Sequence, residues 1–287
     1  MVFDLKDLSA AKKQYLLQSI IAPRPICFAS TIDKEGRVNL SPFSFFNMFS
    51  ANPPIVVFSP ARRVRDNTTK HTLQNVLEVP EVVINIVTYD MVQQMSLSSC
   101  EYGKEVDEFT KAGFTKEKAD IVSPPMVKES KAKLECKVIE VKSLGEEGGA
   151  GNLVICEILR LHLDDSLLME DDKLDPSKLE LVARLGGDWY CRISKENLFI
   201  VPKPNIKLGI GIDALPEHIR FSKYLTGNHL GMLANVEEMP LPDDEFSADV
   251  FENMDDNLDK TEQLHQHAVL LLNQNKVHDA WQVLIKQ

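Results

Sequence analysis

Short extended runs separated by tight turns dominate residues 26–163 and limit the folds that this chain can adopt. The runs are rich in β-branched and aromatic residues, which fit strands, whereas Gly36 and the Pro53-Pro54 pair mark turns. The predicted strands cover residues 26–32, 37–41, 55–59, 82–87, 130–143 and 152–163. Many short strands with hairpin turns and few helices predict a mainly β fold, an antiparallel barrel rather than a doubly wound sheet.

Helices are predicted at the periphery of these strands. They cover residues 9–20, about 70–78, and two short stretches near 91–98 and 106–112. Ser9 is a suitable N-cap for the first of them. The polar stretch 91–120 is long enough to cover a site, although a plain surface excursion fits it as well. The glycine-rich stretch 145–151 has no Lys-Ser/Thr and no helix after it, so it predicts a hairpin loop and not a phosphate-binding loop.

A cluster of positive charge stands out in a chain whose formal net charge is −11. Five basic residues fall within ten positions, namely Arg62, Arg63, Arg65, Lys70 and His71. They precede a predicted helix for which Thr68 or Thr69 is a suitable N-cap. A helix N-terminus offers free N–H groups to an anion, so the cluster indicates a site for a phosphomonoester. A solvated basic loop that pairs with nearby acids is the alternative.

The composition limits the other classes of function. The acidic balance argues against nucleic acid as a partner, and no apolar run reaches the length of a membrane span. Residues 1–7 lack the apolar core of a signal peptide. The five cysteines are scattered without a C-x-x-C pair, which favours neither a disulfide framework nor a zinc site. These features predict a cytoplasmic protein without a metal centre.

Several sequence blocks follow one another in an order that is typical of a known family. They are Arg24-Pro25-Ile26, Ser30-Thr31, Gly36, Asn39 through Asn47, Pro53-Pro54, Ser59, Lys70 through Asn75, Val82 through Val87, Leu134-Glu135-Cys136 and Ala183 through Tyr190. Together they resemble the flavin reductase-like family of FMN-binding split β-barrel proteins, which includes the flavoredoxins. The resemblance covers roughly residues 15–203. It implies an antiparallel FMN-binding split β-barrel, with non-covalent FMN as cofactor and NAD(P)H as co-substrate.

The resemblance also implies three sets of cofactor-binding residues. The phosphate is expected at Ser59, Arg62, Lys70, His71 and Thr72, although many relatives carry an acid where this chain has His71. The segments expected to line the isoalloxazine ring are Phe28, Ala29, Ser30 and Thr31, and Ser44, Phe45, Phe46 and Asn47. Arg184 and Tyr190 are expected near the flavin or near a subunit interface. Ser30 and Thr31 could donate hydrogen bonds near N5, where reduced flavin gains negative character. No other catalytic group is expected.

The composition changes after Lys203-Pro204, which predicts a boundary between a split-barrel domain, residues 1–203, and an extension, residues 204–287. Residues 237–259 contain ten acids and no base, which is typical of a solvated linker. Two amphipathic stretches between Leu258 and Gln287 predict a helical hairpin that distantly resembles one tetratricopeptide unit. Since one such unit cannot bury its own apolar face, it is expected to pack on the barrel or on a partner.

These observations predict a homodimeric flavoprotein that moves a hydride between a nicotinamide and flavin N5, as an NAD(P)H-dependent flavin reductase or a flavoredoxin-like electron carrier. A protein electron acceptor is a further candidate partner. One alternative is an FMN-dependent oxidase or reductase of a small organic substrate on the same fold. Another is a flavin-binding or partner-binding module without turnover.

Overall fold

The computed structural model of the chain contains two compact units, Met1–Phe199 and Ile200–Gln287. It describes residues 1–202, 208–252, 254–255 and 257–286. The boundary predicted between residues 203 and 204 lies outside the described residues. Each unit is therefore described by itself.

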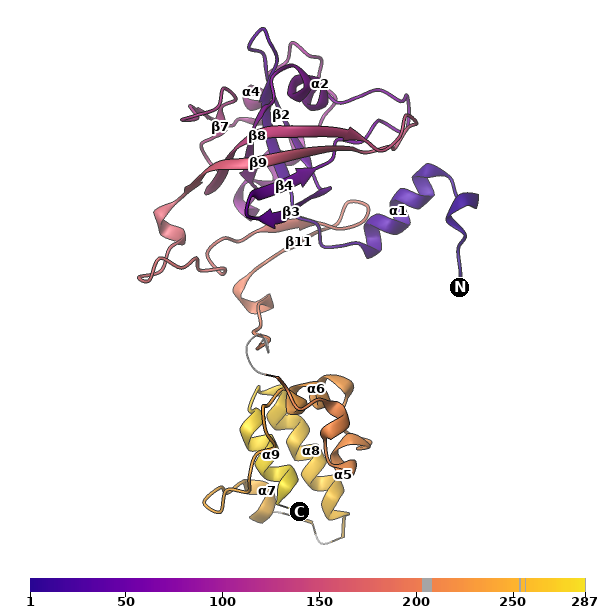
Figure 1. The fold of residues 1–287 in the computed structure, drawn as a ribbon, viewed down its shortest axis with the longest axis vertical. Coiled ribbons are helices and arrows are strands. Elements are labelled where there is room, and N and C mark those ends of the chain that lie inside the picture. Colours follow the sequence, from indigo (N-terminus) through magenta and orange to yellow (C-terminus); the bar gives the residue numbers. More distant parts are fainter. Residues whose placement is uncertain (203–207, 253, 256, 287) are drawn as a thin grey trace. The chain divides into compact units, whose positions relative to one another are not determined.

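Unit 1 is built on one seven-stranded antiparallel sheet (Figure 1). Its strands are β1 (Cys27–Ile32), β2 (Val38–Phe43), β3 (Phe46–Ala51), β4 (Pro54–Phe58), β5 (Glu81–Ile86), β8 (Ala132–Ser143) and β9 (Asn152–Leu163). They lie in the order β2-β1-β5-β8-β9-β4-β3. Two short pairs accompany this sheet, β6 (Lys116–Glu117) with β7 (Met126–Val127) and β10 (Val182–Arg184) with β11 (Tyr190–Arg192). The prediction of an antiparallel, strand-rich fold is confirmed.

The sheet curls because its two edge strands are consecutive in the sequence. Strands β2 and β3 occupy opposite ends of the strand order, yet only Ser44 and Phe45 connect them. Two residues span only about 7 Å, so the two edges must approach each other at this corner. The Phe45 carbonyl accepts the Ser59 N–H at 2.8 Å and fastens the corner to the end of β4. Among the described residues no strand pairing joins β2 to β3, so the sheet is curled but not closed.

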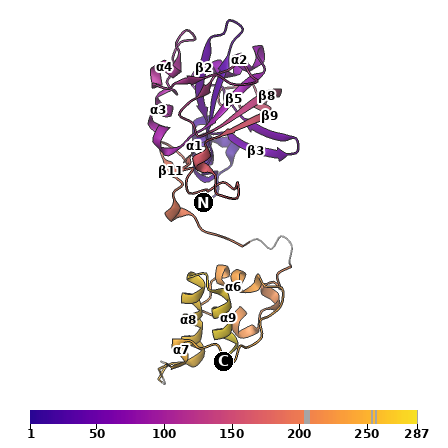
Figure 2. The same ribbon diagram turned by 90° about the vertical axis from the view of Figure 1, so that its left-hand side faces the viewer.

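Helices cover both faces of the curled sheet. The helices of unit 1 are α1 (Ala10–Ile20), α2 (His71–Glu78), α3 (Val92–Leu97) and α4 (Glu108–Ala112). Figure 2 shows α2 on one side of β2, and α3 and α4 on the other. Leu73 and Val76 of α2 join an inner cluster that contains Ala29 and Phe58, whereas Phe28 and Leu40 face an outer cluster that contains Phe109 of α4. Both clusters form because successive side chains along a strand point to opposite faces.

Two local predictions are confirmed in unit 1. Ser9 caps α1, since its Oγ accepts the Lys12 N–H at 3.3 Å. The glycine-rich stretch 145–151 connects β8 and β9 as a hairpin loop. This loop packs against the basic loop, because an added Cβ at Gly148 would lie 3.1 Å from the Arg63 carbonyl oxygen. Only glycine permits that approach.

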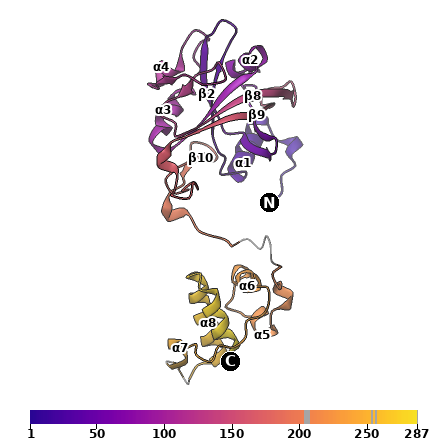
Figure 3. The same ribbon diagram turned by 60° about the vertical axis from the view of Figure 1, so that its left-hand side comes forward.

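Unit 2 is helical. Its helices are α5 (Glu217–Arg220), α6 (Gly227–Ala234), α7 (Asp249–Glu252), α8 (Lys260–Asn273) and α9 (Val277–Ile285) (Figure 3). Short 3₁₀ turns in the two units span Leu5–Asp7, Tyr89–Met91, Asp165–Leu167, Lys195–Asn197 and Ile212–Ala214. The predicted helical hairpin is α8 with α9. Its apolar side chains pack on Leu215 and Ile219 and on Leu233 of α6, within one cluster of unit 2. The apolar face of the hairpin is thus covered within unit 2 by α5 and α6, two helices that the sequence analysis did not predict.

Part of the acidic stretch is attached to this helical core. The Asp243 N–H donates to Gln282 Oε1 at 2.8 Å, and Gln282 Nε2 donates to the Leu241 carbonyl at 3.0 Å. Lys286 Nζ also donates to the Phe246 carbonyl at 2.6 Å. Residues 241–246 are thus held against α9, and the prediction of a solvated linker does not hold for them. None of the described helices combines the length and the apolar character needed to cross a bilayer.

Candidate functional site

The N-terminus of α2 lacks a side-chain cap. The N-cap residue is Lys70, which makes no capping hydrogen bond. Thr68 and Thr69, the predicted caps, lie further from the helix, and the Thr68 hydroxyl donates to Asp66 Oδ1 at 2.6 Å. Leu73 N–H already bonds the Lys70 carbonyl, whereas the N–H groups of His71 and Thr72 have no acceptor among the described residues. Uncapped N–H groups and the helix dipole favour an anion here.

Arg63, and not Arg62, brings its guanidinium to this helix end. Arg62 folds back over its own loop, with Nε donating to Asn67 Oδ1 at 2.6 Å and Nη2 to the Asn67 carbonyl at 2.8 Å. Arg63 Nη1 instead donates to the Thr69 carbonyl at 2.9 Å, beside Lys70. The backbone of this loop turns at Asn67, whose φ of +57° is in the left-handed region.

Acidic residues neutralise part of the basic cluster. Glu101 lies 2.9 Å from Arg63 Nε and 2.8 Å from Arg65 Nη2, and Arg65 also pairs with Asp66 at 3.0 Å. The alternative of a solvated, acid-paired loop thus describes Arg65, whose side chain is 72% exposed. Within the described part of the chain no carboxylate forms an ion pair with Lys70. The uncapped helix end, Lys70 and Arg63 are called the anion corner below.

Burial and nearby positive charges lower the pKa values of two basic side chains at the anion corner, Lys70 and His71. Burial, and then the Arg63 guanidinium, lowers the pKa of the Lys70 ammonium from its usual value. Burial, and then the positive charges of Arg63, Lys104 and Lys70, likewise lower the pKa of His71. This shift favours the neutral imidazole, which can offer an anion an N–H group. A bound anion would relieve the repulsion between Lys70 and Arg63.

A buried polar network fastens α2 to the sheet next to the anion corner. Thr72 Oγ1 accepts from Asn39 Nδ2 of β2 at 2.9 Å, and Thr31 Oγ1 accepts from Asn75 Nδ2 at 3.2 Å. The Thr72 hydroxyl is fully enclosed, so this residue can offer an anion only its backbone N–H. Asn75 Oδ1 is buried without a partner in the described structure.

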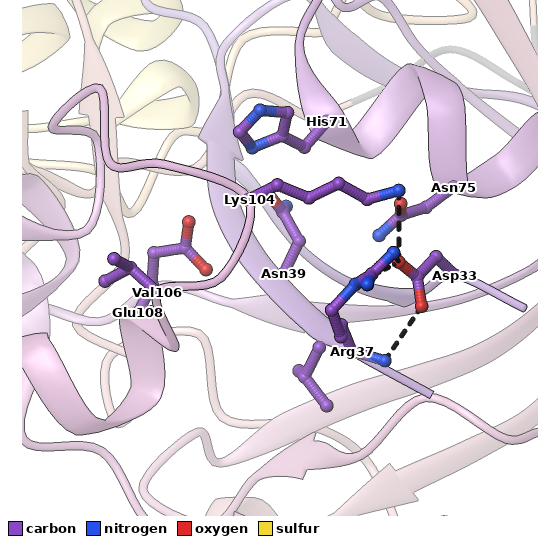
Figure 4. Close-up of a pocket in the computed structure, with 9 residues that line it drawn as sticks. Asp33, Arg37, Asn39, His71, Asn75, Lys104, Val106 and Glu108 are labelled. Carbon is purple, nitrogen blue, oxygen red and sulfur yellow. Dashed lines mark hydrogen bonds and ion pairs between the residues drawn. The ribbon is translucent and has the colours of Figure 1, made fainter. Parts of the chain in front are cut away.

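A narrow cavity of about 10 Å³ lies beside this network and has room for about one water molecule. Its lining residues are Asp33, Arg37, Val38, Asn39, His71, Asn75, Lys104, Val106 and Glu108. Figure 4 shows Lys104 reaching across it to Asp33, at 3.2 Å. Together with the contact between Glu101 and Arg63, this ion pair fastens the stretch between α3 and α4 over the anion corner. That arrangement favours the interpretation of residues 91–120 as a cover.

The predicted ring segment of β1 is enclosed. Phe28 and Ser30 lie on the outer face of β1, where Phe28 packs edge-on against Phe114 with ring centroids 5.3 Å apart. Ala29 and Thr31 lie on the inner face, and all four side chains are 0% exposed. The Ser30 hydroxyl has no partner among the described residues. These side chains support the site from beneath and do not line a surface that a flavin ring could reach.

The other predicted ring segment forms the corner between β2 and β3. Phe45 is 41% exposed and Asn47 is also exposed, whereas Phe46 packs against the inner cluster. Ser59 is buried on the opposite side of this corner, where an added Cβ at Gly151 would lie 2.6 Å from its Oγ. Ser59 is therefore enclosed by the hairpin loop.

A larger cavity of about 180 Å³ brings together three predicted residues from distant parts of the sequence. Ser44, Arg184 and Tyr190 line it with Ile26, Pro42, Met95, Ser96 and Ser99. The Arg184 guanidinium lies over the Tyr190 ring, 4.5 Å from its centroid. Arg63 belongs to the predicted basic cluster, although the resemblance assigned the phosphate contact to Arg62. The sequence did not assign Glu101, which pairs with Arg63, Lys104, which pairs with Asp33, or Asn39, which bonds Thr72. Glu101 and Lys104 come from a stretch without a distinguishing pattern.

Three potential metal ligands, Asp120, Glu135 and His162, also lie close together. The buried Glu135 carboxylate already accepts the N–H groups of Asp120, Ile121 and Val122, at 3.1, 2.7 and 3.0 Å. It also contacts His162 Nε2 at 2.6 Å. These contacts fix the loop of residues 120–122 to the sheet.

Comparisons with known proteins show the family of this chain and the fold of its relatives. The flavin reductase like domain family matches residues 20–177. An uncharacterized protein of Halalkalibacterium halodurans is 35% identical over 202 residues, which cover 70% of this chain and 95% of that protein. The crystal structure of nitrilotriacetate monooxygenase component B from Bacillus cereus superposes with a TM-score of 0.65 at 27% identity, over 70% of this chain and 98% of that one. A split barrel domain protein of Shewanella frigidimarina gives a TM-score of 0.60 at 28% identity, over 71% and 99%.

The solved relatives thus match unit 1 along almost their whole length, in agreement with the curled antiparallel sheet. The match with the family covers more than half of the chain and includes β1 through β9. The chain belongs to the flavin reductase-like domain family.

Proposed function

We propose that this protein binds FMN non-covalently and oxidises NAD(P)H, as a flavin reductase or a flavoredoxin-like electron carrier. The observation that supports this most directly is the anion corner, where an uncapped helix N-terminus meets an unpaired lysine in an acidic chain. A phosphomonoester fits there, because it carries about −1.5 to −2 charges near neutral pH. When bound, FMN supplies the hydride chemistry, and the protein supplies placement and electrostatics.

The residues at the anion corner would make different kinds of contact with a bound phosphate. Lys70 provides a positive charge, and the N–H groups of His71 and Thr72 provide directed donors. We assign to Arg63 the phosphate contact that the resemblance implied for Arg62. Of these two arginines, it is Arg63 whose guanidinium lies beside Lys70. The ring of the flavin would lie along the exposed corner of Ser44 and Phe45. Arg184 and Tyr190 would stand at its edge.

The test is to purify the full chain and record its absorbance and its oxidation of NADH and NADPH with added FMN. The proposal requires a bound flavin spectrum and nicotinamide oxidation that depends on FMN. Flavin binding without nicotinamide oxidation would favour an oxidase or an electron carrier with another donor. Absence of flavin binding would leave only a partner-binding module.

Glu101 is expected to compete with the cofactor phosphate, because both are anions that pair with Arg63. Glu101→Gln should therefore tighten FMN binding by up to about fivefold, the scale of an exposed ion pair of about 1 kcal/mol. Flavin fluorescence titration measures this change. Glu105→Gln is the matched control, since Glu105 lies in the same stretch but 3.7 Å from Arg37. Weaker binding in Glu101→Gln would contradict competition.

We also propose that a second copy of the chain covers strand β3. This edge strand exposes Met48 and Phe49, by 55% and 68%, directly after the corner assigned to the flavin. Helix α1 likewise contains no buried residue and exposes Tyr15. Exposed apolar surface of this kind marks an interface, and an edge strand can meet the same edge of an identical chain.

Phe49→Glu is expected to weaken the dimer at least tenfold, because it removes apolar burial and places two like charges near a symmetry axis. Sedimentation velocity measures the dimer dissociation constant. FMN affinity should fall with it if the partner copy completes the ring site. Leu77→Glu on α2 is the control, since Leu77 is 66% exposed away from β3. A stable Phe49→Glu dimer would exclude this face.

A further inference from the structure

The cavity beside the β2–β3 corner has features that the binding of FMN phosphate does not use. Its walls are largely polar, with Ser44, Ser96 and Ser99 beside the partly exposed Pro42, because Ile26 and Met95 also line it but are only 5% and 1% exposed. Its volume of about 180 Å³ is below the roughly 300–1,000 Å³ of drug-sized ligand sites. It is therefore suited to one small ring and not to a nucleotide.

The charge at this cavity is uncompensated. Arg184 forms no ion pair with any carboxylate in the described structure, and its guanidinium is held only by stacking on Tyr190. Arg24 pairs with Arg184 across an isolated bridge, and its own guanidinium bonds only carbonyl groups, Ile21 and Leu185 at 2.8 Å among them. Burial and the charge of Arg184 lower the pKa of Arg24. Arg24 does not line the cavity, so Arg184 is the cation that an anion there could reach, and its charge is unpaired in the described structure.

A carboxylate is the anion that fits best. The planar guanidinium of Arg184 can form two parallel hydrogen bonds to one carboxylate, and stacking on Tyr190 holds it in one orientation. Pro42 and the Tyr190 ring, both partly exposed, offer a flat surface to an aromatic ring. We infer that this cavity binds a small aromatic monocarboxylate, with Arg184 as its anchor and Pro42 against its ring.

This inference rests on the proposed function in one respect: Ser44, Arg184 and Tyr190 also border the proposed flavin ring, so the carboxylate would lie next to that ring. Carboxylate binding and flavin binding are separate measurements, so either can fail alone. Benzoate is the probe, and benzamide is its uncharged counterpart of nearly the same shape. A preference for benzoate isolates the contribution of the charge.

The experiment is calorimetric titration of the full-length protein with benzoate and with benzamide, with and without saturating FMN. The native protein should bind benzoate at least about tenfold more tightly than benzamide, as expected for a charge-assisted pair. Arg184→Gln should abolish that preference. Arg192→Gln is the matched control and should retain it, since Arg192 also stacks on a tyrosine, Tyr89, but pairs with Glu180.

A second variant makes the test independent of any loss of folding in Arg184→Gln. Ser96 is exposed on α3 and lines the cavity, so Ser96→Phe should fill it and abolish binding of both probes. Gln93→Phe, at an exposed position of the same helix that does not line the cavity, should bind as the native protein does. Equal affinity for benzoate and benzamide, or a benzoate preference that survives in Arg184→Gln, overturns the inference. A failure of FMN binding alone overturns the proposed function and leaves the carboxylate site standing.

Discussion

Replacing Lys70 with alanine should weaken FMN binding by about 1.5–3 kcal/mol, or roughly 10- to 150-fold. Lys70 is the one cation of the anion corner that has no ion-pair partner among the described residues, whereas Arg63 is shared with Glu101. Partial burial shields its ammonium from water, so a charge-assisted hydrogen bond to a phosphate would be stronger than at an exposed lysine. Quenching of flavin fluorescence on titration measures the dissociation constant.

Two comparisons make this prediction specific. Lys137→Ala removes an exposed lysine on β8, in the sheet but not at the anion corner, and should leave FMN affinity unchanged. The affinity of the native protein should fall with ionic strength, and the Lys70→Ala variant should show a weaker salt dependence because one charge is missing. If the Lys70→Ala variant binds FMN as tightly as the native protein, the phosphate lies elsewhere.

Strand β5 was predicted from a continuous apolar run, which is typical of a strand buried on both faces. The side chains of Val82, Val83 and Ile84 in β5 are completely buried. A short unbroken run of β-branched residues of this kind is typical of a buried strand. Strand β3 was missed because it is an edge strand, whose exposed Asn47 and polar Ser50 break the pattern. The connection of β2 and β3 at opposite ends of the sheet depends on tertiary pairing and cannot be derived from local pattern.

Helix α6 was missed although its start has a recognisable sequence signal. Thr226 Oγ1 accepts the His229 N–H at 3.3 Å, and the Thr226 N–H donates to His229 Nδ1 at 3.2 Å. This is a capping box in which histidine takes the place usually occupied by Glu or Gln. The usual signal has Glu or Gln at the third helical position, so a search for that pattern does not find this helix.

The position of the candidate site along the chain could be predicted, because it depends on a local cluster of charge. The directions of its arginine side chains could not be predicted, because they depend on how the loop folds. The density of basic residues before α2 predicted an anion site on this part of the chain, and the structure has an uncapped helix end there, beside Lys70 and Arg63. The choice between Arg62 and Arg63 depends on the turn at Asn67, which directs one guanidinium back and the other toward Lys70. Contacts from Glu101 and Lys104 span more than 30 positions of sequence, so no local pattern indicates them.

Trp281→Ala should destabilise unit 2 by about 3–5 kcal/mol, the usual cost of truncating a large core side chain. Trp281 is 0% exposed and packs among α6, α8 and α9. Its Nε1 donates to the Leu233 carbonyl at 3.1 Å, so the change also leaves a buried acceptor without its donor. Urea unfolding followed by circular dichroism measures the loss, because the substitution removes one of the two tryptophans in the chain.

The same variant tests whether flavin binding resides in unit 1 alone. Trp281 belongs to a core made only of residues after Ile200, whereas the anion corner and the carboxylate cavity use residues before Phe199. FMN affinity should therefore be unchanged in Trp281→Ala, and also in a shortened chain that ends at Phe199. Leu270→Ala on α8 is the control for stability, since its side chain is 58% exposed and the change should alter the free energy of unfolding by less than about 0.5 kcal/mol. A loss of FMN binding in step with the unfolding of unit 2 would mean that the helical extension helps to form the flavin site, and the division of function between the two units would have to be abandoned.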